Sequence, residues 1–160
     1  MASDMYLKID GIDGESKDDG HADEIDVLAW SWGMSQSGTM HGGGGGGAGK
    51  VAIQDISFTK AVDKASSNLM LACCKGTHID EAVLTVRKAG GDPLEYLIIT
   101  MKGVLVSSVS SGGSEQGEGL TENLTLNFRE VEVKYQPQDD AGAADGGTID
   151  MTWNIQANTE

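Results

Sequence analysis

The segment LTENLTLNFREVEVKYQP, residues 120–137, decides the fold because its apolar residues change phase once along a single strand. They first take alternate even positions, as on one face of a β-strand: Leu124, Leu126 and Phe128. Past Arg129 and Glu130 they take the odd positions: Val131, Val133 and Tyr135. A strand whose buried face switches bends around a corner and contributes to two sheet layers, which is how small barrels and orthogonal sandwiches close. The segment predicts an antiparallel β-barrel of two sheets.

Alternating or continuous apolar stretches elsewhere predict further strands. They are MYLKI (5–9), IDVLAWSWGM (25–34), VAIQDISF (51–58), AVLTVRKAGGDPLEYLIITMK (82–102), VLVSSVS (104–110) and TIDMTWNIQ (148–156). The stretch 82–102 is a hairpin around the turn AGGDP, and the phase of 51–58 slips at Gln54 and Asp55, which indicates a bulge or bend. We expect 148–156 to be the half-buried strand that closes the barrel.

One short helix is predicted between Asp63 and Gly76. Ser66 or Ser67 can cap its start, and Gly76 suits its end. Its apolar side holds Leu69, Met70, Ala72 and Cys73. We expect it to be the only helix of an otherwise all-β domain that spans residues 1–160.

The glycine run 42–47 does not form a phosphate-binding loop. Gly44, Gly49 and Lys50 have the spacing of such a loop, but Val51 follows, where magnesium binding needs a Ser or Thr hydroxyl. The run also joins two predicted strands, whereas a phosphate loop must open into a helix whose amides hold the anion. We expect an extended glycine-rich arm over residues 39–49.

Composition excludes several classes of protein. The formal net charge of −14 disfavours nucleic acid, which is bound through Lys and Arg. No apolar stretch approaches the roughly 20 residues that span a bilayer, so membrane insertion is not expected. The first residues lack the basic and apolar regions of a signal peptide. We expect synthesis in the cytoplasm, with export by a signal-independent machine left open.

The sequence offers no catalytic, metal or cofactor site. Cys73 and Cys74 are neighbours with no ligand partner at zinc spacing, and we expect two reduced thiols on the helix. The three histidines, His21, His41 and His78, are expected in loops. An enzyme is therefore not predicted. A ligand- or carbohydrate-binding barrel stays as the alternative function, because tryptophans could line a sugar site, although core packing suits them better: Trp30, Trp32 and Trp153.

Long motifs resemble the haemolysin-coregulated protein (Hcp) family along nearly the whole chain. They are HADEIDVLAWSWGMSQSG (21–38), VAIQDISFTK (51–60), VRKAGG (86–91), EYLIITMK (95–102), VLVSSVSSGGS (104–114) and LTENLTLNFREVEVKYQPQ (120–138). The resemblance implies a homohexameric ring, rings stacked into the inner tube of the type VI secretion apparatus, and export through that apparatus. It also implies contacts with other type VI components, effector proteins carried in the ring lumen by a passive receptor and chaperone, and no enzymatic activity.

Two surfaces of such a ring can be assigned expectations. If Trp30 and Trp32 fill the core, strand alternation turns a strip of small residues outward, which we expect to face the lumen and admit cargo: Ala29, Ser31 and Gly33. We expect the arm to contact a neighbouring or stacked subunit through Thr39, Met40, His41, Gly42, Gly43, Gly44, Gly45, Gly46 and Gly47. Leu97 and Ile99, on a strand apolar on both faces, are expected at an interface, with an enclosed core strand as the alternative.

Overall fold

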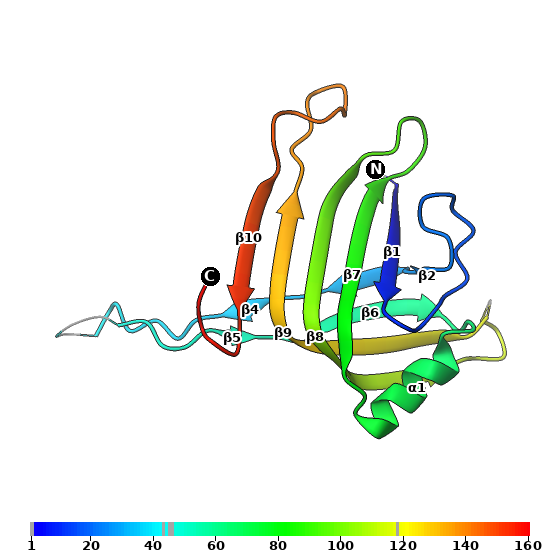
Figure 1. Ribbon diagram of the computed structural model, residues 1–160, viewed down its shortest axis with the longest axis horizontal. Coiled ribbons are helices and arrows are strands. Elements are labelled where there is room, and N and C mark those ends of the chain that lie inside the picture. Colours follow the sequence, from blue (N-terminus) through cyan, green and yellow to red (C-terminus); the bar gives the residue numbers. More distant parts are fainter. Residues whose placement is uncertain (1, 43, 45–46, 118) are drawn as a thin grey trace.

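The protein folds as a curled antiparallel sheet with a short helix at one end (Figure 1). The computed structural model describes residues 2–42, 44, 47–117 and 119–160. The helix is α1 (Ser66–Lys75). The strands are β1 (Ser3–Ile9), β2 (Ile25–Asp26), β3 (Ala29–Ser31), β4 (Met34–Ser35), β5 (Ala52–Ile53), β6 (Ile56–Ala61), β7 (Ile79–Lys88), β8 (Glu95–Gly112), β9 (Thr121–Tyr135) and β10 (Ile149–Asn154).

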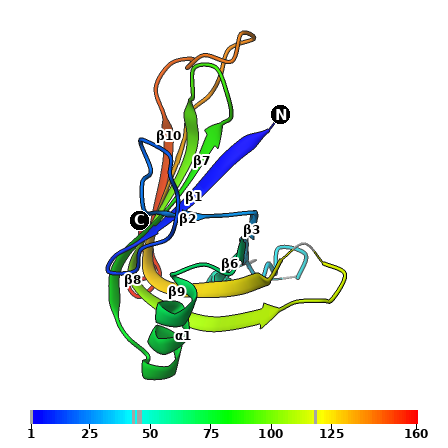
Figure 2. The ribbon, with the colours of Figure 1, turned by 90° about the vertical axis from the view of Figure 1, so that its right-hand side faces the viewer.

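The predicted bend in β9 is confirmed, and β8 bends beside it. Figures 1 and 2 show both long strands turning from one layer of the sheet into the other. The side chains of Phe128 and Val131 are both buried, so the buried face switches between them as expected. At the turn, Gly103 of β8 has φ 63°, and a Cβ there would lie 2.5 Å from Nε of Arg129. Glycine is favoured at this position because the backbone is left-handed and its neighbour is close.

A single segment, residues 25–31, bridges the two edges of the curled sheet. Its first half pairs with β1, with Leu7 opposite Ile25. Its second half pairs with β6, with Trp30 opposite Phe58. The expectation that 148–156 closes the barrel is wrong, because among the strands that the structure describes β10 pairs only with β9, and Ile149 is left 65% exposed.

The core is enclosed by both layers and by α1. Its fully buried side chains include Leu7, Ile25, Phe58, Leu69, Leu84, Leu124 and Leu126. Trp30 and Trp32 are half-buried and pack against this core, as the alternation predicted. The break expected at Gln54 and Asp55 separates β5 from β6.

The helix ends as predicted but begins differently. Gly76 adopts the left-handed conformation that ends α1. Its N-cap is Ala65, which supplies no side-chain hydrogen bond, so the expected cap by Ser66 or Ser67 is wrong. Instead, Oδ1 of Asp63 accepts a hydrogen bond of 2.9 Å from the Ala65 amide.

An ion pair that the sequence did not indicate lies fully buried beneath the start of α1. Lys60 of β6 and Glu122 of β9 are register partners, and neither side chain is exposed. Nζ of Lys60 lies 3.0 Å from Oε1 of Glu122 and 2.9 Å from Oδ1 of Asp63. Nζ also donates a hydrogen bond of 3.3 Å to Oγ of Ser66. The Lys60 ammonium therefore connects the start of α1 to strands β6 and β9.

Candidate interaction surfaces

Ser31 lies in a row of hydroxyl side chains that crosses four strands. Backbone register places Ser31 opposite Ser57, Ser57 opposite Thr125, and Thr125 opposite Ser108. These side chains are exposed or half-buried, whereas the alternate positions, such as Phe58, are in the core. Because alternate residues of a strand point to opposite faces, the row lies on the face turned away from the core.

A second row runs beside the first. Ala29 lies opposite Thr59, Thr59 opposite Asn123, and Asn123 opposite Ser110. Oγ1 of Thr59 donates to Oδ1 of Asn123 at 2.7 Å. The two rows together, Ala29, Ser31, Ser57, Thr59, Ser108, Ser110, Asn123 and Thr125, form what we call the hydroxyl face. Gly33 lies beyond the end of β3, where its carbonyl accepts a hydrogen bond from the amide of Gln54. It therefore lies at the edge of the hydroxyl face and not within its two rows.

One carboxylate borders the hydroxyl face. Oδ2 of Asp55 accepts a hydrogen bond from Ser107 at 2.7 Å, and Oδ1 accepts from Asn127 at 2.8 Å. The hydroxyl groups of Ser107 and Ser108 lie 2.7 and 2.6 Å from Oγ1 of Thr125. These bonds hold the side chains of Ser107, Ser108 and Thr125 in place. The residues of the hydroxyl face are all short and uncharged, so the face is low in profile and uncharged apart from its border.

The arm extends away from the sheet on the left of Figure 1. At its base β4 pairs with β5, and further out Gly38 bridges Ala48. The Thr39 hydroxyl donates to the carbonyl of Gly47 at 2.9 Å. Exposed residues of the arm include Thr39, Met40, His41, Gly42, Gly44 and Gly47, and the side chain of Met40 is 81% exposed. The expected contacts of Gly43, Gly45 and Gly46 lie outside the described residues.

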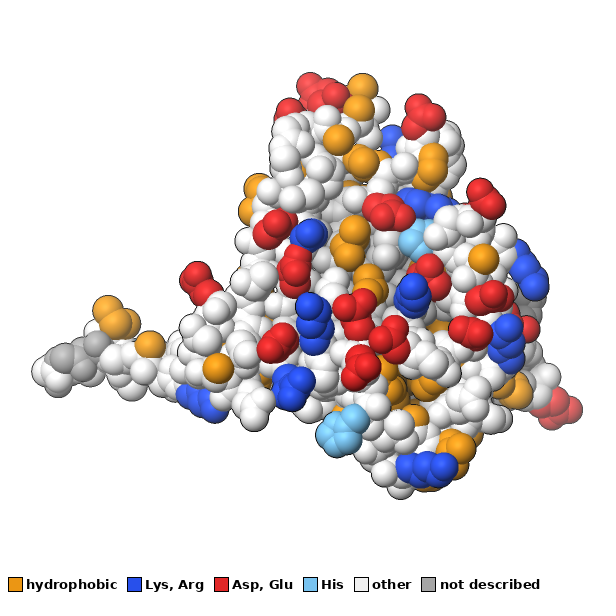
Figure 3. All heavy atoms as spheres, viewed as in Figure 1, with side chains coloured by type: hydrophobic (Ala, Val, Ile, Leu, Met, Phe, Trp, Pro, Cys, Tyr) orange, Lys and Arg blue, Asp and Glu red, His pale blue; other side chains and the backbone are white. Residues whose placement is uncertain are grey.

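The arm and its flanking strands carry no carboxylate. From Val27 to Gln54 the sequence contains no Asp or Glu, although the chain has 25 of them in all. Acidic side chains are instead scattered over the body in Figure 3, including its top, where the loop between β9 and β10 lies. The arm can therefore approach another copy of this acidic protein with little charge repulsion.

A groove of about 470 Å³ lies between the base of the arm and β10. Apolar side chains of Met34, Val51, Ile53, Met151 and Trp153 line much of it. The Nε1–H group of Trp153 is buried and has no hydrogen-bond partner among the described residues. Trp32 donates its own Nε1–H to the carbonyl of Gln54 at 2.9 Å.

Of the two β8 residues expected at an interface, only Leu97 is accessible to a neighbouring molecule. Ile99 is 2% exposed and belongs to the core, so its expected interface role is wrong, and the enclosed-strand alternative holds for it. Leu97 is half-buried and packs against the core, which leaves part of it accessible. Exposed apolar side chains lie elsewhere. Met70 and Leu71 are exposed on α1. Val62 and Leu120 are also exposed, and they are neighbours because the Val62 amide donates a hydrogen bond to the Leu120 carbonyl.

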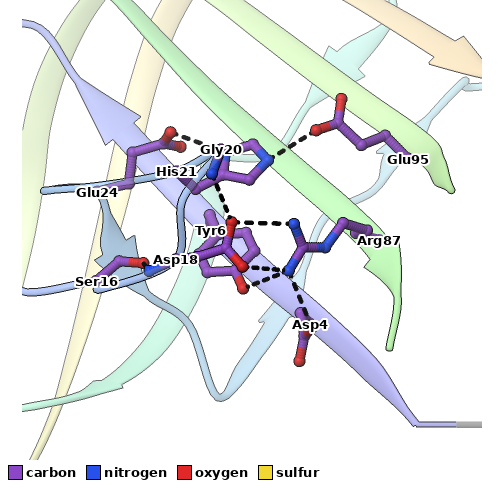
Figure 4. A network of polar contacts seen from close by, with 9 residues as sticks. All are labelled: Asp4, Tyr6, Ser16, Asp18, Gly20, His21, Glu24, Arg87 and Glu95. Carbon is purple, nitrogen blue, oxygen red and sulfur yellow. Dashed lines mark hydrogen bonds and ion pairs between the residues drawn. The ribbon is translucent and has the colours of Figure 1, made fainter. Parts of the chain in front are cut away.

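His21 occupies a polar network that sequence analysis missed (Figure 4). Its side chain is largely buried, stacked on the ring of Tyr6 with centroids 4.5 Å apart. Nδ1 lies 2.8 Å from Oε2 of Glu24, and Nε2 lies 2.7 Å from Oε1 of Glu95. Glu24 was recognisable as a neighbour three residues away. Nothing in the sequence indicated that Glu95, on β8, meets the same ring.

Arg87 of β7 makes a second contact to the same loop. Its two terminal nitrogens donate to the two carboxylate oxygens of Asp18 at 3.0 and 2.6 Å. These hydrogen bonds from Arg87 lower the pKa of Asp18 to about 2. Nη2 also donates to the Tyr6 hydroxyl at 3.0 Å and to Asp4 at 3.3 Å.

The described residues contain no group of three or more His, Cys, Asp or Glu side chains placed to hold a metal ion. Cys73 and Cys74 are free thiols on α1, as expected. Within the same part of the chain, no helix has both the length and the apolar character needed to cross a membrane.

Comparison with known proteins gives one consistent result. A family model described as "Type VI secretion system effector, Hcp" matches residues 6–135. Protein hcp1 of Pseudomonas aeruginosa is 63% identical over 161 residues, which cover 100% of this chain and 99% of that protein. The crystal structure of Hcp1 from Salmonella typhimurium is 44% identical with a TM-score of 0.84, covering 100% of this chain and 99% of that one. A structure described as a type six secretion system protein is 34% identical with a TM-score of 0.93, and 99% of each chain is covered.

Proposed function

The chain belongs to the Hcp family of type VI secretion proteins, and we propose that six copies form a ring whose stacked rings make the inner tube of the apparatus. The ring is exported through the apparatus and carries effector proteins in its lumen as a receptor and chaperone. The hydroxyl face is the observation that carries this proposal. A passage for varied cargo requires a wall without projecting bulk or strong charge, and this face supplies one across four strands of each subunit.

Apolar surfaces at two ends of the molecule support a head-to-tail ring. The groove beside β10 lies on the side of the arm, and α1 carries Met70 and Leu71 away from it (Figure 1). Different surfaces that meet head to tail generate a closed ring when the rotation closes. The unpartnered Nε1–H of Trp153 would then receive an acceptor from the neighbouring copy, because a buried donor left without one costs about 1–3 kcal/mol. Leu97 would contribute its accessible part to the same contact.

The arm serves to join one ring to the next. It extends beyond the sheet, contains no carboxylate and presents Met40 to solvent. Between subunits that each carry a net charge of −14, an uncharged and partly apolar extension lowers the repulsion that opposes stacking. Residues 39–49 are therefore the proposed stacking contact.

Substitution Ser31→Gln tests the lumen assignment. The longer side chain should project from the hydroxyl face and reduce co-purification of a tagged effector about tenfold or more, since weak contacts repeated around a ring weaken together. The melting temperature and the mass of the assembled particle should not change, because Ser31 is exposed and outside the core.

The matched control is Ser114→Gln, an exposed serine in the turn between β8 and β9. It should leave effector binding as in the parent protein. Equal effector recovery with Ser31→Gln and with Ser114→Gln would show that the hydroxyl face is not the cargo surface.

A further inference from the structure

We propose that His21 is a proton-operated latch that fastens the loop of residues 10–24 to the start of β8. The loop joins β1 to β2 and folds on itself through backbone hydrogen bonds, such as those from Gly14 to Asp23 and from Ser16 to Glu24. Through its side chain, His21 reaches from this loop to Glu95, a contact between residues 74 apart in the sequence.

The geometry at His21 requires both ring nitrogens to carry a proton. A carboxylate accepts hydrogen bonds and cannot donate them, and a carboxylate faces each nitrogen of this ring. A neutral imidazole has only one N–H group, so it would turn a lone pair toward one of the two carboxylates. Protonation therefore decides whether both contacts can exist together.

The charged surroundings favour the protonated ring. Burial alone would lower the pKa of His21, but the hydrogen bonds to Glu24 and Glu95 and their charges outweigh it and raise the pKa above the ordinary value. Glu24 and Asp18 of the loop and Glu95 of β8 act on the His21 ring directly. The Tyr6 ring stacked on it is in turn surrounded by Asp4 of β1, Asp18, Asp26 of β2 and Arg87 of β7. Arg87 is the one cation among them.

The contact to Glu95 is the one that opens on deprotonation. The side chain of Glu95 is 42% exposed, whereas that of Glu24 is 13% exposed. The Glu95 carboxylate can therefore turn into water at little cost, while Glu24 would lose its partner inside the protein. Asp18 and Arg87 hold the other part of the loop and stay charged, so the loop loosens around His21 without detaching.

The direction of the pH dependence follows from the raised pKa. The stabilisation by the latch is complete below the pKa of an unfolded histidine and is lost as pH rises through the pKa of His21 in the folded protein. The loop should be held firmly in mildly acidic solution and loosened in alkaline solution.

Hydrogen–deuterium exchange of the full-length protein, measured at pH values from about 5.5 to about 9, tests the latch. An NMR titration of the His21 ring over the same range gives the pH at which the ring loses its proton. As His21 loses its proton, amides of residues 14–24 should exchange about tenfold faster than the ordinary base-catalysed increase accounts for. Glu95→Gln removes the charge and supplies an amide that can donate to a neutral ring, so this step should move to lower pH by about half a unit or more, or disappear. The exposed-histidine control His78→Gln should leave it unchanged.

Substitution His21→Phe keeps a ring that can stack on Tyr6 but removes both hydrogen bonds, so the loop should exchange fast at every pH while the exchange of β8 and β9 stays slow. Loop exchange that shows no extra step while His21 titrates would overturn the proposal. So would a step that Glu95→Gln leaves at the same pH, and that result stands whether or not His21→Phe folds.

Discussion

Replacing Lys60 with methionine is expected to destabilise the protein by about 3–5 kcal/mol, the usual cost of leaving a buried charge without its partner. Two carboxylates depend on this ammonium: Glu122, which is fully buried, and Asp63, which is 11% exposed. Their mutual repulsion in the absence of Lys60 adds to the cost of burying each one. The free energy of unfolding from urea denaturation measures the effect.

Two further variants separate charge from packing. Lys64→Met removes an exposed lysine four residues later, with a side chain 53% exposed, and should change stability by less than about 0.5 kcal/mol. The double variant Lys60→Met, Glu122→Leu removes both fully buried charges and should recover at least half of the loss, since apolar replacement of a buried pair is often neutral. A Lys60→Met protein as stable as Lys64→Met would show that the pair is not held as the structure has it.

Shortening the arm is expected to abolish ring stacking without unfolding the subunit. If residues 40–47 are replaced by a two-residue turn, β4 and β5 keep their pairing, and the core loses no buried side chain. The change in loop-closure entropy is small, so the melting temperature should stay within a few degrees. Negative-stain electron microscopy should then show single rings in place of stacked ones.

The loop between β9 and β10 provides the matched control. Removing residues 140–144 also shortens an exposed, glycine-containing loop, but one that is acidic. Stacking should survive that change. Filaments of normal length from the shortened-arm protein would refute the stacking role, and loss of the fold would show that the arm is part of the core structure.

Local patterns along the chain predicted much of the fold. The phase change in 120–137 gave the bend, because a buried-face switch is visible within one strand. The hairpin over 82–102 and the end of α1 at Gly76 followed from turn residues and glycine conformation. The strip at Ala29 and Ser31 followed from alternation with Trp30, and both residues are exposed in the structure.

Features that depend on distant pairing were missed. Nothing local links Lys60 to Glu122, or His21 to Glu95, because each pair meets only once the sheet has formed. For the same reason Ile99 looked like an interface residue: its neighbours in sequence are apolar on both faces, and only tertiary packing shows which side the core covers. The role of residues 25–31 as the bridge between β1 and β6 also depends on strand order, which alternation does not encode.

The mass of the protein in solution tests the central claim most directly, because a tube subunit must first form a closed ring. Light scattering coupled to size-exclusion chromatography, run over a wide range of protein concentrations, should give one species of six 16.7 kDa chains, about 100 kDa, or whole-number stacks of it. A monodisperse monomer or dimer at every concentration would contradict the account, since no ring would exist to stack or to enclose cargo.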